Sequence, residues 1–138
     1  MTDVCNFNDQ TLGEEISNAI SHGLGAALSI AGTVVMIVSA ALNHKTPITI
    51  VGVSIFGASL ILLYLTSCLY HSLVPNKGKK VFQILDHCMI FILITGTYTP
   101  ICFSLIGGWV GWTVWGFNMA CTVLGVVLNA INLAKWHK

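Results

Sequence analysis

Charged residues are scarce in this sequence. Only 8% of its 138 residues are charged, whereas 55% are hydrophobic, and the mean hydropathy is +0.82. A soluble domain typically carries about a quarter charged residues. The composition therefore excludes an ordinary soluble domain and predicts an integral membrane protein.

The alternation of polar and apolar residues that marks membrane β-strands is also absent, and such strands run to only about 10 residues. Instead, four apolar segments reach the length of about 20 residues that a membrane-spanning helix needs. They cover approximately residues 18–42, 48–71, 81–104 and 109–133. None of them contains Lys or Arg, and Asp86 is their only acidic residue. The sequence thus predicts an all-α fold, an integral membrane helical bundle with four spans.

Paired cysteine spacings and a basic N-terminal region are missing as well. The five cysteines follow no disulfide or metal-ligand pattern, so we expect neither a disulfide framework nor a cysteine-based metal site. The first fifteen residues contain no Lys or Arg, which is the reverse of a cleavable signal peptide. We expect residues 1–13 to form a polar cytoplasmic tail and residues 14–138 to form the transmembrane domain, whose first span inserts the chain.

The six lysines predict the orientation of the chain in the membrane. If the spans alternate, Lys45 lies alone on one side. The other side then holds Lys77, Lys79, Lys80, Lys135 and Lys138. Short segments rich in lysine stay in the cytoplasm. This bias predicts a multi-pass protein of the cell (inner) membrane with both termini in the cytoplasm.

Polar side chains occur where a membrane helix ordinarily has none. Ser67 and His71 close the second apolar segment, and Asp86 lies just inside the third. Ionisable residues within membrane segments are costly, and for that reason they usually have a function. Ser67 and His71 are four residues apart and therefore share one face of a helix. With the predicted orientation, His22, His71 and Asp86 all lie at the cytoplasmic side.

An imidazole, a hydroxyl and a carboxylate at one depth suit a zinc ion and its bound water. Histidine ligates the metal, while a carboxylate orients or deprotonates the water. We therefore expect Ser67, His71 and Asp86 to face one another inside the bundle. Two simpler alternatives stay open: His71 is a hydrogen-bonded interfacial residue, or Asp86 pairs with His87 or with a nearby loop lysine.

A second polar stripe precedes the first span. Glu14, Asn18 and His22 follow one another at intervals of four residues, so they also share a helix face. This stripe is an additional candidate for the polar site. The alternative for His22 is a packing role between helices.

Four segments make the sequence resemble a known family. They are EEISNAISHGLGAALSIAG (14–32), SCLYHSL (67–73), LDHCMIFILITGTYTP (85–100) and GGWVGW (107–112). Together they are similar to bacterial haemolysin III-like proteins of the progestin and adiponectin receptor (PAQR) superfamily, which resembles the alkaline ceramidases. The resemblance covers nearly the whole chain after residue 13.

The resemblance implies an all-helical protein, normally of seven spans, with zinc as cofactor near its cytoplasmic side. In the Ser-x3-His motif of that family, His71 corresponds to a zinc ligand and Ser67 to its partner. Asp86 corresponds to the acid that holds the metal-bound water. The polar stripe of the family corresponds to Glu14 or Glu15, Asn18 and His22. The implied reaction is hydrolysis of a lipid amide or ester by zinc-activated water, with Asp86 and Ser67 as the catalytic pair.

One motif of the family is missing from this sequence. The last span of the family carries a His-x3-His pair that supplies two more zinc ligands. No such pair occurs here, since His137 is the only histidine after His87. We interpret the chain as the N-terminal part of a longer family member, truncated after the fourth span, and we expect it to bind zinc weakly.

Three functional hypotheses follow. The first is a haemolysin III-like integral membrane protein with part of a zinc-dependent hydrolase site. The others are a non-enzymatic membrane-perturbing (haemolytic) or membrane-homeostasis protein, and an inactive fragment. The expected partners are the lipid bilayer, a lipid substrate, and either a homo-oligomer or the missing C-terminal helices, but no nucleic acid.

Reporter fusions test the predicted orientation. Alkaline phosphatase is inactive in the cytoplasm, so a fusion after Lys138 should be inactive, because that end is predicted to be cytoplasmic. A fusion in the turn at residues 43–47 should be active. The reverse pattern would refute the orientation and place the candidate site at the other face of the membrane.

Overall fold

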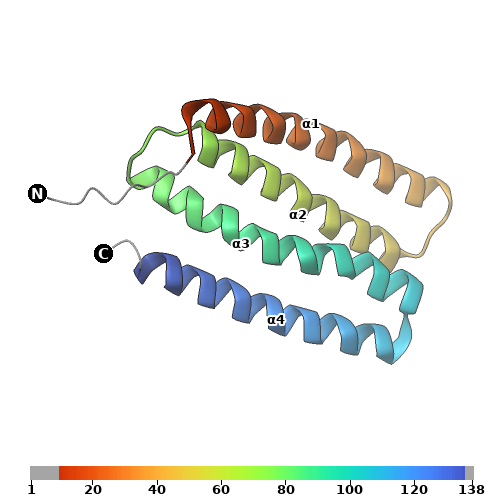
Figure 1. The fold of residues 1–138 in the computed structure, drawn as a ribbon. Helices are drawn as coiled ribbons and strands as arrows, with labels where there is room; N and C mark the ends of the chain where they lie inside the picture. The colour runs from red at the N-terminus through yellow and green to blue at the C-terminus, as the bar shows by residue number, and fades with distance from the viewer. Residues whose placement is uncertain (1–9, 136–138) are drawn as a thin grey trace, which may run out of the picture.

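The computed structural model describes residues 10–135, and for residues 132–135 only the backbone. Its elements are α1 (Leu12–Leu42), α2 (Pro47–Ser72), α3 (Lys77–Pro100), the π-helical segment η1 (Ile101–Ile106) and α4 (Gly108–Lys135) (Figure 1). Four helical stretches, the third made of α3 and η1, are long and apolar enough to cross a membrane. The predicted all-α membrane bundle is thereby confirmed. Of the predicted tail, residues 1–9 lie outside the described residues.

Helix α1 begins at Leu12, before the first apolar segment. The Glu14 backbone N–H donates a hydrogen bond to the Thr11 hydroxyl, and the Thr11 backbone N–H donates one of 2.6 Å to the Glu14 carboxylate. This reciprocal capping box satisfies two backbone donors that would otherwise be unpaired at the helix start. Glu14 therefore caps α1 at its exposed end.

Pro100 ends α3 without ending the span. Proline lacks the backbone N–H of a helical turn. The next six residues continue as the wider helix η1, where the Gly107 N–H donates to the Cys102 carbonyl at 2.9 Å. Gly107 and Gly108 then turn the chain into α4 with φ values of 62° and 56°, which glycine adopts easily because it has no Cβ.

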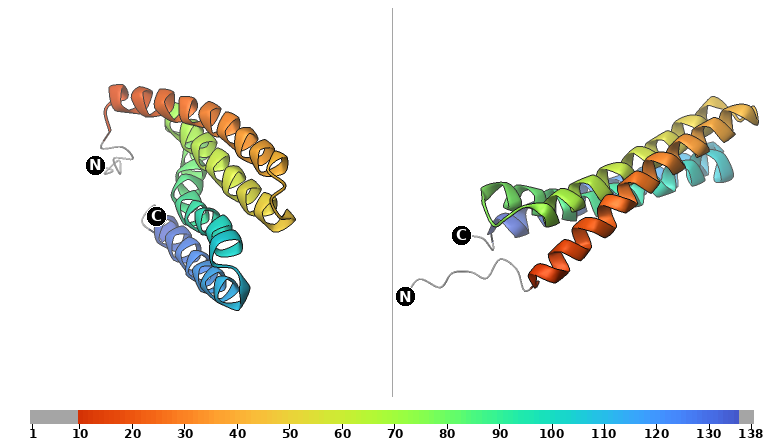
Figure 2. Two further views of the ribbon diagram at one scale, coloured as in Figure 1. Left: turned by 90° about the vertical axis from the view of Figure 1, so that its right-hand side faces the viewer. Right: turned by 90° about the horizontal axis from the view of Figure 1, so that it is seen from above.

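The four spans form a curved row in chain order. Backbone contacts join α1 to α2, α2 to α3 and α3 to α4, whereas within residues 10–135 none joins α1 to α3 or α4. Figure 2 shows α1 at one edge of the row and α4 at the other. The start of α1, the end of α2, the start of α3 and the end of α4 lie together at one end (Figure 1). This arrangement gathers the polar residues of the first three spans.

Small residues let α1 and α2 pack closely. A Cβ added at Gly25 would lie 2.7 Å from the Tyr64 ring, and one added at Gly57 would overlap the Thr33 side chain. Neither position has room for a larger residue, as is common where membrane helices cross closely. The close contact holds His22, one turn before Gly25, against α2.

Candidate functional site

A buried carboxylate joins three helices at the polar end of the row. Glu15 of α1 is only 6% exposed. Its Oε2 lies 2.9 Å from the His71 Nδ1 of α2, and its Oε1 accepts a hydrogen bond of 2.9 Å from the Lys79 Nζ of α3. Since the backbones of α1 and α3 are not in contact, Glu15 links the two helices across the end of α2.

Lys79 is buried although it carries a charge. It is 7% exposed, and its ammonium lies 5.3 Å from the centre of the Tyr70 ring. A cation over an aromatic face is stabilised by the ring quadrupole. Asn76 caps α3 by accepting a hydrogen bond of 2.9 Å from the Lys79 backbone N–H, which fixes the first turn of the helix. The ion pair, the ring and the cap together account for the buried ammonium.

A second pair of polar groups lies one turn deeper, between α1 and α2. His22 Nδ1 and Ser67 Oγ are 2.5 Å apart, and Ser67 is 2% exposed. The rings of His22 and His71 meet edge to face, with their centres 5.7 Å apart. The Tyr64 ring packs against the other side of His22, at 5.8 Å. Two imidazoles therefore lie next to each other, and each has its Nδ1 bound to an oxygen.

The cluster opens into a cavity of about 460 Å³ beside α1 and the loop after α2. Glu15, His71 and Lys79 contribute its charged and ionisable groups, and apolar residues of α1 supply much of the remaining wall. A cavity of this volume is in the range of small-molecule sites, about 300–1,000 Å³. His71 is thus accessible from outside the helix row.

The structure brings together three of the residues that the sequence singled out: His22, Ser67 and His71. Ser67 and His71 share a face of α2, as their spacing predicts, but Ser67 bonds to His22 rather than to His71. Two members of the predicted stripe lie away from this cluster. Glu14 caps α1, and the Asn18 amide donates to the Gln10 side chain at 3.5 Å.

Asp86 lies close enough for its charge to act on Tyr70, whose ring packs against His71, but it is not bonded to the cluster. Its carboxylate is 3.9 Å from the His87 Nδ1, and its side chain is 18% exposed. Among the described residues, no hydrogen bond or ion pair joins Asp86 to Ser67 or His71. Pairing with the neighbouring His87 is one of the alternatives that the sequence left open for Asp86.

Sequence analysis missed the roles of Glu15 and Lys79. Helical spacing contains the signal for Glu15: successive residues are about 100° apart, so a residue seven positions before His22 points within about 20° of it. Glu14, eight positions before His22, is displaced by about 80°. For the pairing of Lys79, the sequence contains one indication. Lys79 lies in the first turn of a helix, where the helix dipole disfavours a cation and an acidic partner would offset this cost.

The histidines suit a metal only in part. Because an ionised carboxylate only accepts hydrogen bonds, the His71 Nδ1 must donate to Glu15, and its Nε2 keeps a lone pair for a ligand bond. A catalytic zinc site usually needs three protein ligands. Across residues 10–135 there is no group of three His, Cys, Asp or Glu side chains able to hold a metal ion. The described residues therefore do not complete a zinc site.

The sequence of the chain matches a known protein family. It matches the family described as "Haemolysin-III related" over residues 10–138. The chain belongs to the haemolysin III-related family. The match begins at residue 10, close to the start of α1, so it includes all four spans and the polar cluster.

Two curated relatives support this membership. The chain is 38% identical to "Hemolysin-3" of Bacillus cereus over 138 residues, which are 100% of this chain and 63% of the relative. It is 43% identical to "Hemolysin-3 homolog" of Bacillus subtilis (strain 168) over 126 residues, which are 91% of this chain and 59% of the relative. The sequence thus spans about three fifths of the length of these relatives. No solved structure gave a significant match.

Replacement of Glu15 should destabilise the helix row. Glu15→Gln removes the counter-charge of a buried ammonium, and losing one partner of a buried ion pair costs about 3–5 kcal/mol. We expect a lower melting temperature in mild detergent, measured by circular dichroism. Glu14→Gln is the matched control, because glutamine also completes a capping box. Equal melting temperatures for the two variants would contradict the role assigned to Glu15.

Proposed function

We propose that this haemolysin III-related membrane protein carries the first part of a zinc-dependent hydrolase site that acts on a lipid amide or ester. In this proposal it lies in the cell (inner) membrane with both termini in the cytoplasm, so the cluster faces the cytoplasmic leaflet. The single observation that supports it best is the pair of Glu15 and His71. A carboxylate bound to one nitrogen of an imidazole is the usual way in which a metal-ligating histidine is oriented.

The residues of the chain have distinct roles in this proposal. Glu15 holds the His71 ring and its tautomer, while Lys79 keeps Glu15 ionised by pairing with its other oxygen. Ser67 holds the neighbouring His22 ring, which packs edge to face against His71. When bound, zinc would supply an activated water for attack on the carbonyl carbon of the substrate.

Asp86 keeps its predicted catalytic role only as part of this proposal. The acid lies on α3 near the same end of the row, but 3.9 Å from His87 rather than within the cluster. Its role therefore rests on the motif that it shares with the family.

The remaining ligands must come from elsewhere in this proposal, because the described residues offer no group of three. The relatives are longer, since the chain covers 63% and 59% of them. Helices from the remainder of a full-length family member, or from a second copy of the chain, would face the open side of the row and supply the missing ligands.

Zinc retention tests the proposal. We expect the 138-residue chain, purified with a mild chelator, to lose its zinc because one oriented histidine binds the metal weakly. Fusion to helices that carry a His-x3-His pair should raise retention to about one zinc per chain, since three ligands are then present. Metal content is measured by mass spectrometry of the purified proteins.

Variants of the fusion distinguish residues that bind the metal from residues that act in hydrolysis. His71→Ala should abolish retention, whereas Asp86→Ala should spare metal binding better than hydrolysis of a lipid amide or ester. His44→Ala, in the turn at the other end of the row, is the control and should leave retention unchanged. Stoichiometric zinc in the short chain alone would show that the site is complete without further helices.

A non-enzymatic function is the second candidate. The relatives are named for haemolysis, and large apolar side chains are exposed along the helices, for example Leu28, Phe117 and Leu128. In this alternative the protein disturbs or maintains the bilayer by its packing alone. Lysis of erythrocytes that is unchanged by His71→Ala would favour this candidate over the hydrolase.

A further inference from the structure

One amide lies inside the fourth span with only part of its hydrogen-bonding capacity used. Asn118 lies close to the middle of Gly108–Ile131, the 24-residue stretch of α4 that is apolar enough to cross a membrane. No water is available at the centre of a bilayer, so a polar group there depends on protein partners.

The Asn118 amide is bonded to α3 through one of its two polar atoms. Its Oδ1 accepts a hydrogen bond of 2.7 Å from the Thr95 hydroxyl, whereas its nitrogen has no partner among the described residues. Because an amide has two N–H groups, at least one stays unpaired whichever way the side chain is turned. Among the described residues, every side-chain N or O atom that is fully buried has a partner. The unpaired nitrogen therefore lies at the surface of the helix row, where the membrane presents hydrocarbon.

Other polar side chains of the spans satisfy their donors within the chain. The hydroxyls of Thr33, Thr66 and Thr97 donate to carbonyls four residues earlier in their own helices. Asn129, the next amide along α4, donates to the Cys88 Sγ of α3 at 3.7 Å. An N–H exposed to hydrocarbon loses its hydrogen bonds to water and gains none, which is costly. Asn118 should therefore find a partner outside the chain.

The surface beside Asn118 is free of the other helices of the row. Helix α4 lies at one edge of the row, and within residues 10–135 its backbone contacts only α3 and η1 (Figure 2). Three exposed residues of α4 continue the helix face of Asn118 at heptad-like spacing. Together with Asn118 they form what we call the α4 stripe: Val114, Asn118, Cys121 and Leu128.

We propose that the α4 stripe binds the same stripe of a second copy of this chain, with the two Asn118 amides hydrogen-bonded to each other. A primary amide both donates and accepts, so two identical groups related by a twofold axis complete each other. Asparagine side chains hydrogen-bond across membrane helices, and one polar position in an apolar seam fixes the register of the pair. The contact needs neither His71 nor a metal, so it is independent of the proposed hydrolase site.

Energy transfer between labelled chains tests this contact. Chains that carry a donor or an acceptor fluorescent protein after Lys138 are reconstituted together in bilayers at increasing protein-to-lipid ratios. We expect a saturable dimer, and Asn118→Leu should weaken it about tenfold, as expected for the loss of an interhelical hydrogen bond. Asn129→Leu is the matched control: it removes an amide of α4 that is already bonded within the chain, and it should leave association unchanged.

Cysteine cross-linking identifies the face of α4 that is in contact. Cys121 is kept and the other four cysteines are replaced by alanine, so that mild oxidation should give a disulfide-linked dimer. Transfer of the cysteine to position 123 (Cys121→Ala with Val123→Cys) keeps nearly the same depth but turns it about 200° around the helix, and should give about tenfold less dimer.

Asn118→Gln keeps an amide and should retain the dimer, and circular dichroism verifies the helix content of every variant. Equal association of Asn118→Leu and Asn129→Leu would overturn the proposal. Equal cross-linking from positions 121 and 123 would also overturn it, because it would indicate random collision. A chain that stays monomeric at every protein-to-lipid ratio would overturn it as well, since lipid would then cover the α4 stripe.

Discussion

The contacts of the Glu15 carboxylate are the interaction on which the rest of the structure depends. A carboxylate that is almost fully buried is stable only if both of its oxygens find donors. Glu15 finds one in His71 and one in Lys79, which are supplied by two other helices. The backbones of α1 and α3 are not in contact, so this side chain joins the two helices directly at the polar end of the row. The need to satisfy a buried charge therefore constrains how the first three spans meet at this end of the row.

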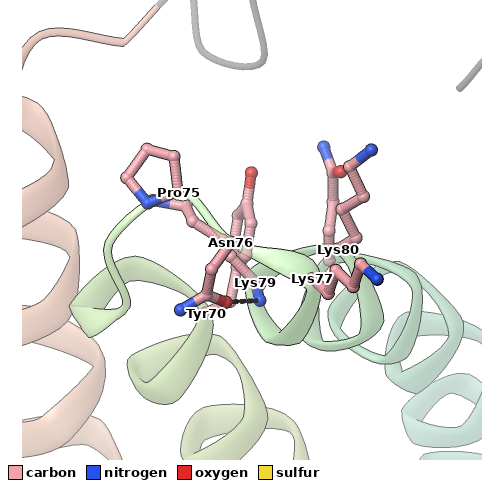
Figure 3. A pocket seen from close by; sticks show the side chains of 7 residues that line it. Tyr70, Pro75, Asn76, Lys77, Lys79 and Lys80 are labelled. Carbon is pink, nitrogen blue, oxygen red and sulfur yellow. Dashed lines mark hydrogen bonds between the residues drawn. The ribbon is translucent and has the colours of Figure 1, made fainter.

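Lys79 lies between two cavities at this end of the molecule. One cavity contains His71 and Glu15, and the other contains Lys77 and Lys80 (Figure 3). Lys79 lines both, with its ammonium bound to Glu15 and lying over the Tyr70 ring. Lys79 and Glu15 thus join the walls of the two cavities next to His71.

Much of the fold is predictable from the sequence, because apolar length alone specifies membrane helices. The four segments near residues 18–42, 48–71, 81–104 and 109–133 correspond to the four helical stretches observed. The proximity of His22 and His71 also follows from alternating spans. Helical spacing favours Glu15 over Glu14, whereas the burial of Lys79 depends on a contact across 64 residues. Such long-range pairing leaves no local pattern in a single sequence.

The tautomer of His71 is the most direct test of the central claim. In nitrogen-15 NMR of the histidine-labelled chain in bilayers, the account predicts that the Nδ1 of His71 carries a proton that is hydrogen-bonded to a carboxylate. The Glu15→Gln variant should shift this signal, while Glu14→Gln should not. A His71 with a bare Nδ1 and a protonated Nε2, unchanged by Glu15→Gln, would contradict the account.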